Sequence, residues 1–252
     1  MSNFWIQSFS LSLAFDWGVI AKYAPDILAN GLVLTLKITV ISAVLAILLG
    51  TVLAAMRLSS IKLVRWTAAS YVNIFRAIPI LMVLFWMFFL VPYVIGFLNF
   101  YWSKWVHGID LGMITPVALD GFICAVVTFT LFEAAYFCEI MRAGINAIPK
   151  GQPAAGYALG LRYHQVMLQI VLPQAFRNML PVLFTQVIVL FQDTSLVAAL
   201  SLRDLLGLSR IVADNTGNQV ELYIFAAVVF FIVSFIGSMI VRYLDKRMAI
   251  IR

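Results

Sequence analysis

Long runs of apolar residues without any charged side chain dominate the chain. A helix needs about 20 mostly apolar residues to cross the roughly 30 Å hydrocarbon core of a bilayer. Four such runs stand out at once, and a fifth is apolar although it carries Glu133 and Glu139 in its second half. We therefore predict five transmembrane helices, at about residues 30–56, 74–96, 117–142, 178–198 and 221–243.

Composition strengthens this interpretation. Residues of the types AVILMFWYC make up 63% of the 252 residues and charged residues 11%, whereas an ordinary globular domain has about 45–50% apolar and about 25% charged residues. One soluble core could not hide so much apolar surface. We expect an all-α polytopic membrane protein with a single membrane domain at residues 26–248, and the two cysteines exclude a secreted disulfide scaffold.

The positive charges are unevenly distributed, and this predicts the orientation of the chain. Membrane proteins concentrate Lys and Arg in their cytoplasmic loops. Twelve of the 17 basic residues fall in the first loop, the third loop and the C-terminal tail: Arg57, Lys62, Arg65, Arg76, Arg142, Lys150, Arg162, Arg177, Arg242, Lys246, Arg247 and Arg252. Since five spans place the termini on opposite sides, we expect the N-terminus outside and the C-terminus in the cytoplasm.

The first 15 residues of the chain are uncharged, which suggests a signal peptide. However, no basic region precedes them, and they are short for a membrane span. We interpret residues 1–25 as a segment at the outer membrane interface, with a cleaved signal peptide as the alternative.

The longest cytoplasmic stretch, residues 142–177, is too apolar for a linker. A sixth span is an alternative, but Arg162 and His164 would lie at its centre, and a basic side chain costs roughly 2.5–3.5 kcal/mol there. Pro153 and Pro173 bound the segment, which therefore predicts short amphipathic helices along the membrane. Gly160 serves either as a helix C-cap or as a point of close backbone approach.

A sparse set of polar side chains lies at membrane depth, where each is costly and therefore a candidate for function. Glu139 and Arg142 are three residues apart and can pair on one helical face. The candidate pathway residues are Lys37, Arg76, Glu133, Gln186, Gln192, Asp193 and Thr194. The alternatives are helix–helix packing for the polar groups, and snorkelling to lipid headgroups for Lys37 and Arg76.

Several chemistries have no signature in the sequence. No GxxxxGK[ST] phosphate loop occurs, so the chain is not expected to bind or split ATP by that route. His107 and His164 fall on opposite sides of the membrane, and Cys124 and Cys138 lie about 21 Å apart along one helix at 1.5 Å per residue. We expect no catalytic residue, no bound cofactor and no metal site.

A specific motif occurs in the cytoplasmic stretch. Ala154, Ala155 and Gly156 are followed after three residues by Gly160, and after nine more by the sequence IVLP, which ends at Pro173. This pattern resembles the EAA loop of ABC-importer permeases, EAA-x3-G-x9-I-x-LP. The chain departs from it with alanine at 154 and glycine at 156, so an ionic role of the usual glutamate does not carry over.

Other stretches resemble the polar amino acid branch of that family, among them residues 30–40, 71–86 and 132–152. Residues 172–205 are similar to permease subunits of glutamate/aspartate importers. The resemblance implies a type I permease of five helices in a bacterial inner membrane. It implies a second, different but similar permease subunit, a periplasmic solute-binding protein, and an ATPase subunit that uses ATP and Mg.

In that family the EAA loop docks a short coupling helix on the ATPase. The residues that match this role are Gln152, Ala154, Ala155, Gly156, Gly160 and Pro173, and we expect residues 152–161 to transmit ATPase closure to the spans.

Two other function classes remain open. A self-sufficient secondary transporter or channel would use an ion gradient, but such folds usually show paired, interrupted spans in two halves. A membrane scaffold or assembly factor would not need the 152–161 segment for transport.

Overall fold

The computed structural model describes residues 15–106 and 119–248, and this part of the chain is helical without any strand. The elements are, in chain order, α2 (Trp17–Asp26), the π-helical turn η1 (Ile27–Leu32), α3 (Val33–Arg57), α4 (Lys62–Ala77), α5 (Ile80–Phe85), the π-helical η2 (Trp86–Leu90), α6 (Val91–Val106), α7 (Gly121–Asn146), α8 (Gly151–Ala158), α9 (Tyr163–Val166), the π-helical η3 (Met167–Val171), α10 (Leu172–Asp193), the 3₁₀ helix η4 (Thr194–Leu200), α11 (Leu205–Thr216) and α12 (Gln219–Met248).

Five helical runs in the described part of the chain are long and apolar enough to cross a membrane: Trp17–Arg57, Ile80–Trp105, Gly121–Asn146, Tyr163–Leu200 and Gln219–Arg247. The predicted fold class, an all-α protein with five such helices, is confirmed. Of the segment expected at the outer interface, residues 1–14 lie outside the described residues. Its remainder is mostly helical, and α2 continues through η1 into α3.

Helix α7 lies at the centre of the fold. It packs against α3, α4, α5 and α10, and it is the most buried of the five apolar runs. The contact with α3 is close because Gly50 has no side chain. A Cβ atom at Gly50 would lie 2.8 Å from the Cβ of Phe137 and 3.1 Å from the carbonyl oxygen of Ala134.

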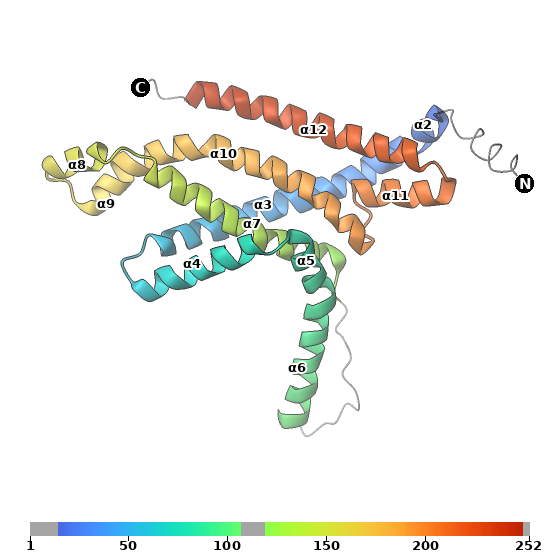
Figure 1. Ribbon diagram of the computed structural model, residues 1–252, viewed down its shortest axis with the longest axis horizontal. Helices are drawn as coiled ribbons and strands as arrows, with labels where there is room; N and C mark the ends of the chain where they lie inside the picture. The colour runs from blue at the N-terminus through green and yellow to red at the C-terminus, as the bar shows by residue number, and fades with distance from the viewer. Residues whose placement is uncertain (1–14, 107–118, 249–252) are drawn as a thin grey trace, which may run out of the picture.

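The helices α3, α7, α10 and α12 share one long direction, whereas α6 runs crosswise to them (Figure 1). The span expected at residues 74–96 is therefore not one straight helix. The break falls at Ile78, whose backbone is extended at φ −106° and ψ 137°. Pro79 causes it, because proline lacks an N–H and disfavours the helical conformation of the residue before it.

The segment expected to form only short helices, residues 142–177, divides at Tyr163. Before this residue lies the short helix α8. After it, α9, η3 and α10 form one continuous helical run. The second part of the coupling loop expected at 150–175 therefore belongs to this long helix, which begins at Tyr163. Pro173 does not end this helix. It lies at the start of α10, directly after the π-helical turn η3.

At the end of the bundle opposite α8, helix α11 fills the space between η1 and α12 (Figure 1). Ile27, Leu205 and Leu222 are fully buried in this contact. The α11 helix begins at Asp204, a fully buried N-cap whose Oδ1 accepts a hydrogen bond from the N–H of Gly207 at 2.9 Å. The long segment at 199–219 is thus a packed part of the fold.

Burial raises the pKa of Asp204 to about 6, although hydrogen bonds from Gly207 and Leu206 act in the opposite direction. Because the folded state holds this proton more tightly than the unfolded chain, wild-type stability should fall as pH rises from about 4 to about 6. Asp204→Asn keeps a cap acceptor without the charge. In thermal unfolding in detergent, the Tm of the variant minus the Tm of the wild type should increase as pH rises from about 4 to about 6. A Tm difference that does not change with pH would contradict this.

Candidate functional site

Two of the polar residues expected at membrane depth form a direct contact between α7 and α10. Nε2 of Gln186 donates a hydrogen bond to Oε2 of Glu133 at 2.9 Å. Glu133 is fully buried, and its Oε1 has no hydrogen-bond partner. A buried polar group of this kind is expensive, so the pair fixes α7 and α10 to each other at this depth.

Glu139 lies between two arginines. Its Oε2 accepts hydrogen bonds from Nε and Nη2 of Arg142, at 3.1 and 2.7 Å, and its Oε1 pairs with Nη1 of Arg57. The predicted pair of Glu139 and Arg142 is therefore present, extended by a residue from α3. This arrangement leaves more positive than negative charge at the site.

A third arginine approaches the same region. Arg76, at the end of α4, lies with its guanidinium 5.5 Å from the ring centroid of Tyr136 on α7. Together with Glu139 and Asn178 it lines a groove of about 490 Å³ between α7 and α10. Arg76 thus faces the groove beside the aromatic ring, and its role in a pathway stays a prediction.

The other predicted pathway residues do not gather at this groove. Nε2 of Gln192 donates to Oγ of Ser234 on α12 at 3.1 Å, on another side of α10. Thr194 is fully buried and bonds the carbonyl of Phe191 within its own chain segment at 2.6 Å. Asp193 is half-buried at the end of α10, and Lys37 is exposed on α3 among apolar side chains.

The short helix α8 ends in a Schellman motif, which explains Gly160. The N–H of Gly160 donates to the carbonyl of Tyr157 at 2.9 Å, and the N–H of Leu161 to that of Gly156 at 3.1 Å. Gly160 has φ +81°, and no atom lies within 4 Å of a Cβ built on it. It therefore serves as a C-cap and not as a point of close approach.

Close approach occurs instead at Gly156, one of the two positions where this chain departs from the EAA pattern. A Cβ there would lie 2.7 Å from Cδ1 of Ile170 and 3.0 Å from Cγ2 of Val166. The buried side chains of Val166, Ile148 and Ala175 form a small core that joins this contact to α7 and α10. The helix α8 is thus packed on α9 and η3, at the start of one long helical run, and the small core connects it to the end of α7.

The residues expected to couple to an ATPase are mostly on the surface. Gln152, Ala154, Ala155 and Gly160 are exposed on and after α8, whereas Gly156 points inward. Leu159, which the sequence analysis did not select, is 82% exposed. Pro173 is also exposed, but it lies on the long helix.

From the sequence, Arg57 was used only to predict which side of the membrane its loop faces. Ser234, the hydrogen-bond partner of Gln192, was not selected. Nothing in the sequence joins Arg57 to Glu139, because the two lie 82 residues apart. The spacing of Glu139 and Arg142 carried a signal, since residues three apart share a helix face.

Comparisons with known proteins find membrane proteins of transport systems. Residues 44–250 match the family described as binding-protein-dependent transport system inner membrane component. The chain is 48% identical over 235 residues to the glutamate/aspartate import permease protein GltK of Escherichia coli O157:H7, which covers 93% of this chain and 99% of that protein. It is 34% identical over 235 residues to the arginine transport system permease protein ArtQ of Bacillus subtilis (strain 168), covering 92% and 98%.

A solved structure is also similar. It is described as the crystal structure of an amino acid ABC transporter with histidines, and it aligns with a TM-score of 0.80 and 28% identity over 93% of this chain and 100% of that chain. The MetNI methionine ABC transporter in an inward-facing conformation aligns with a TM-score of 0.60 at 20% identity, which concerns the fold alone.

The contact between Glu133 and Gln186 predicts a mutational cycle. Gln186→Leu leaves the buried carboxyl without its partner and should destabilise the protein by about 1–3 kcal/mol, whereas Glu133→Leu combined with Gln186→Leu should recover most of that loss. Thermal unfolding of the purified chain measures both effects. Gln169→Leu, at an exposed position of the same continuous helical run, serves as the control. Equal losses in the single and double variants would show that the hydrogen bond does not join the two helices.

Proposed function

The chain belongs to the family of binding-protein-dependent transport system inner membrane components and is a permease subunit of an ABC importer, and from this premise we propose that its substrates are glutamate and aspartate. A permease is a transporter component and not an enzyme. The 48% identical relative is named for import of these two amino acids, and it supports the choice of substrate.

The charge of the groove also supports an acidic substrate. Arg76 lines the groove together with Glu139, and Arg57 and Arg142 pair with the same carboxylate from beside the groove, so arginines outnumber carboxylates in this region. Arginine presents a planar fork of donors that matches a carboxylate, and a surplus of arginine attracts an anion. An excess of carboxylates would have the opposite effect.

The energy for import would come from a separate ATPase subunit, which binds ATP and Mg²⁺. We place its docking surface on α8, where the side chains of Tyr157 and Leu159 are exposed. A second, similar permease chain would complete the pathway, and an external solute-binding protein would deliver the amino acid at the end formed by α2 and α11.

The chain would cross the inner membrane with its N-terminus outside and its C-terminus in the cytoplasm. Figure 1 places α8, the α3–α4 connection and the C-terminal end of α12 at one end of the bundle. Each of these three segments carries a lysine, namely Lys150, Lys62 and Lys246. This supports a cytoplasmic position for this end, because Lys and Arg are concentrated in cytoplasmic loops.

Coupling would follow a continuous packed route. A displacement of α8 presses on Val166 and Ile170 through the close contact at Gly156. The small core of Ile148, Val166 and Ala175 then passes the displacement to α7 and α10, whose polar side chains line the groove. Packed cores respond as units and not by gradual deformation, which suits a two-state opening of the pathway.

The alternative of a self-sufficient secondary transporter or channel finds no support among the relatives, which are permease proteins of import systems.

Reconstitution tests this function. The complete complex in proteoliposomes should take up glutamate and aspartate only with ATP, the ATPase subunit and the binding protein present. Arginine is a matched control substrate of opposite side-chain charge. Uptake by this chain alone under an ion gradient would contradict the proposal, and ATP-driven uptake of arginine in preference to glutamate would contradict the substrate.

Replacing Gly160 tests the coupling route. Gly160→Val forces a β-branched residue into a left-handed conformation, which strains the end of α8 without a steric clash. We expect uptake to fall at least tenfold while ATP hydrolysis continues and membrane insertion is unchanged. Gly151→Ala is the matched control, because its backbone is not left-handed and its Cβ also meets no atom within 4 Å. Unchanged uptake by the Gly160 variant would contradict this route.

A further inference from the structure

A basic cavity lies where α3 ends and α4 begins, and its charges do not belong to the groove described above. It has a volume of about 790 Å³ and is lined by Arg57, Lys62, Arg65 and Arg142 together with Leu58, Leu63, Trp66, Ala69 and Asn146. We propose that this cavity is a binding site for the headgroup of an anionic phospholipid, whose acyl chains lie along α4.

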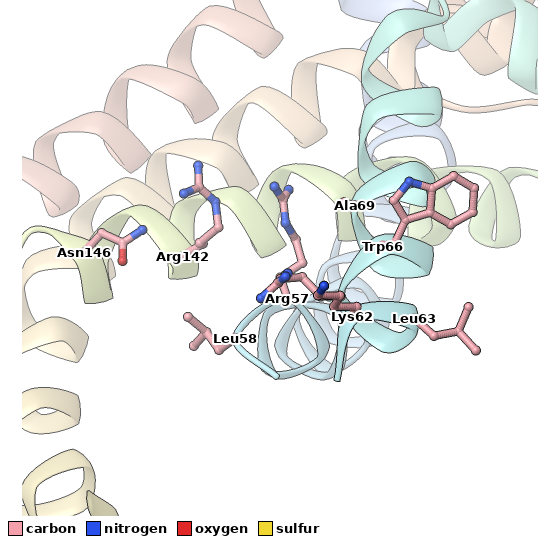
Figure 2. Close-up of a pocket in the computed structure, with 9 residues that line it drawn as sticks. Arg57, Leu58, Lys62, Leu63, Trp66, Ala69, Arg142 and Asn146 are labelled. Atoms are coloured by element: carbon pink, nitrogen blue, oxygen red, sulfur yellow. The ribbon is translucent and has the colours of Figure 1, made fainter. Parts of the chain in front are cut away.

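The cations come from three helices. Figure 2 shows Arg142 and Asn146 on α7, opposite Arg57 at the end of α3 and Lys62 on α4. Glu139 pairs with both Arg57 and Arg142 and holds these two guanidinium groups in place. One carboxylate among four cations leaves a positive surplus, which a phosphodiester would neutralise.

Lys62 and Arg65 are exposed and lie three residues apart, so they share one face of α4 near its start. Flexible, exposed cations of this kind can reach a headgroup that approaches from the side. Basic pockets between transmembrane helices at the cytoplasmic side are typical sites for anionic lipid headgroups. The end of α3 and the start of α4, which line the cavity, lie at the α8 end of the bundle, and the proposed orientation places this end at the cytoplasmic face (Figure 1).

The apolar lining distinguishes a lipid from a free anion. Leu63 is 71% exposed and Trp66 is 69% exposed, and both lie on α4 beside the cations. A tryptophan at headgroup level is typical of a membrane interface, and leucine beside it offers a surface to the acyl chain. A site for free phosphate alone would have no use for this exposed apolar surface.

The cavity is separate from the groove of the proposed pathway. On α7 it uses Arg142 and Asn146, whereas the groove uses Ile140, Gly144 and Ala147, which lie on a different face of the same helix. The two sites meet only at Glu139. A lipid in the cavity would therefore stabilise the positions of Arg57 and Arg142 without entering the pathway.

Native mass spectrometry of the purified full-length chain tests this site, with phosphatidylglycerol as the probe and phosphatidylcholine as the neutral comparison. The variant is Lys62→Gln combined with Arg65→Gln. Since each cation near an anionic surface contributes about fivefold in affinity, the double variant should bind phosphatidylglycerol about 25-fold more weakly. The matched control, Lys246→Gln with Arg247→Gln, removes the same two residue types from the end of α12 and should change binding less than twofold.

Three results would overturn the proposal. One is equal binding of phosphatidylglycerol and phosphatidylcholine by the wild type. Another is competition by millimolar inorganic phosphate at the cavity, which would indicate a site for a free anion. The third is a double variant that keeps its lipid but loses the ATPase subunit on co-purification, which would assign the cavity to a protein contact. The readout requires no transport, so it is independent of the proposed substrate.

Discussion

The cost of charge inside a membrane is the constraint on which this structure depends. Glu139 is tolerated because Arg57 and Arg142 hold its two carboxylate oxygens, and Glu133 is tolerated because Gln186 donates to one of its oxygens. These contacts join α7 to α3 and α10. The helix that carries the two acidic residues is therefore also the helix that the others surround.

A second set of contacts ties α8 to the same two helices. Helix α8 packs on α9 and η3 through Gly156, and the small core around Val166 joins this contact to the end of α7 and the start of α10. The groove between α7 and α10 lies along this route. Arg76 in the groove and the neighbouring Arg57 and Arg142 give this region the positive charge that would attract an acidic amino acid. The lipid site proposed on the neighbouring face of α7 would hold Arg57 and Arg142 in place.

Much of the fold was accessible from the sequence, because uncharged apolar runs are required in a bilayer and rare elsewhere. The bends were harder to predict. Pro79 breaks the second apolar run, whereas Pro173 and Pro181 leave their helix intact, so the presence of a proline alone does not predict which helix breaks. The pairing of Arg57 with Glu139 depends on how α3 packs on α7, which no local pattern contains. The left-handed C-cap at Gly160 was one of two roles that the sequence left open, and the close approach at Gly156 was not predicted.

The central claim is that α8 is the element through which a separate ATPase drives this permease. Site-directed cross-linking tests it most directly, with Leu159→Cys as the reactive position, since that side chain is 82% exposed at the end of α8, and with Lys62→Cys at the same end of the bundle as the comparison. The two natural cysteines are buried. The account predicts that Leu159→Cys cross-links to the ATPase subunit in the assembled complex, with a yield that changes when ATP is bound. A complex that hydrolyses ATP and transports, but in which this position never cross-links to the ATPase, would contradict it.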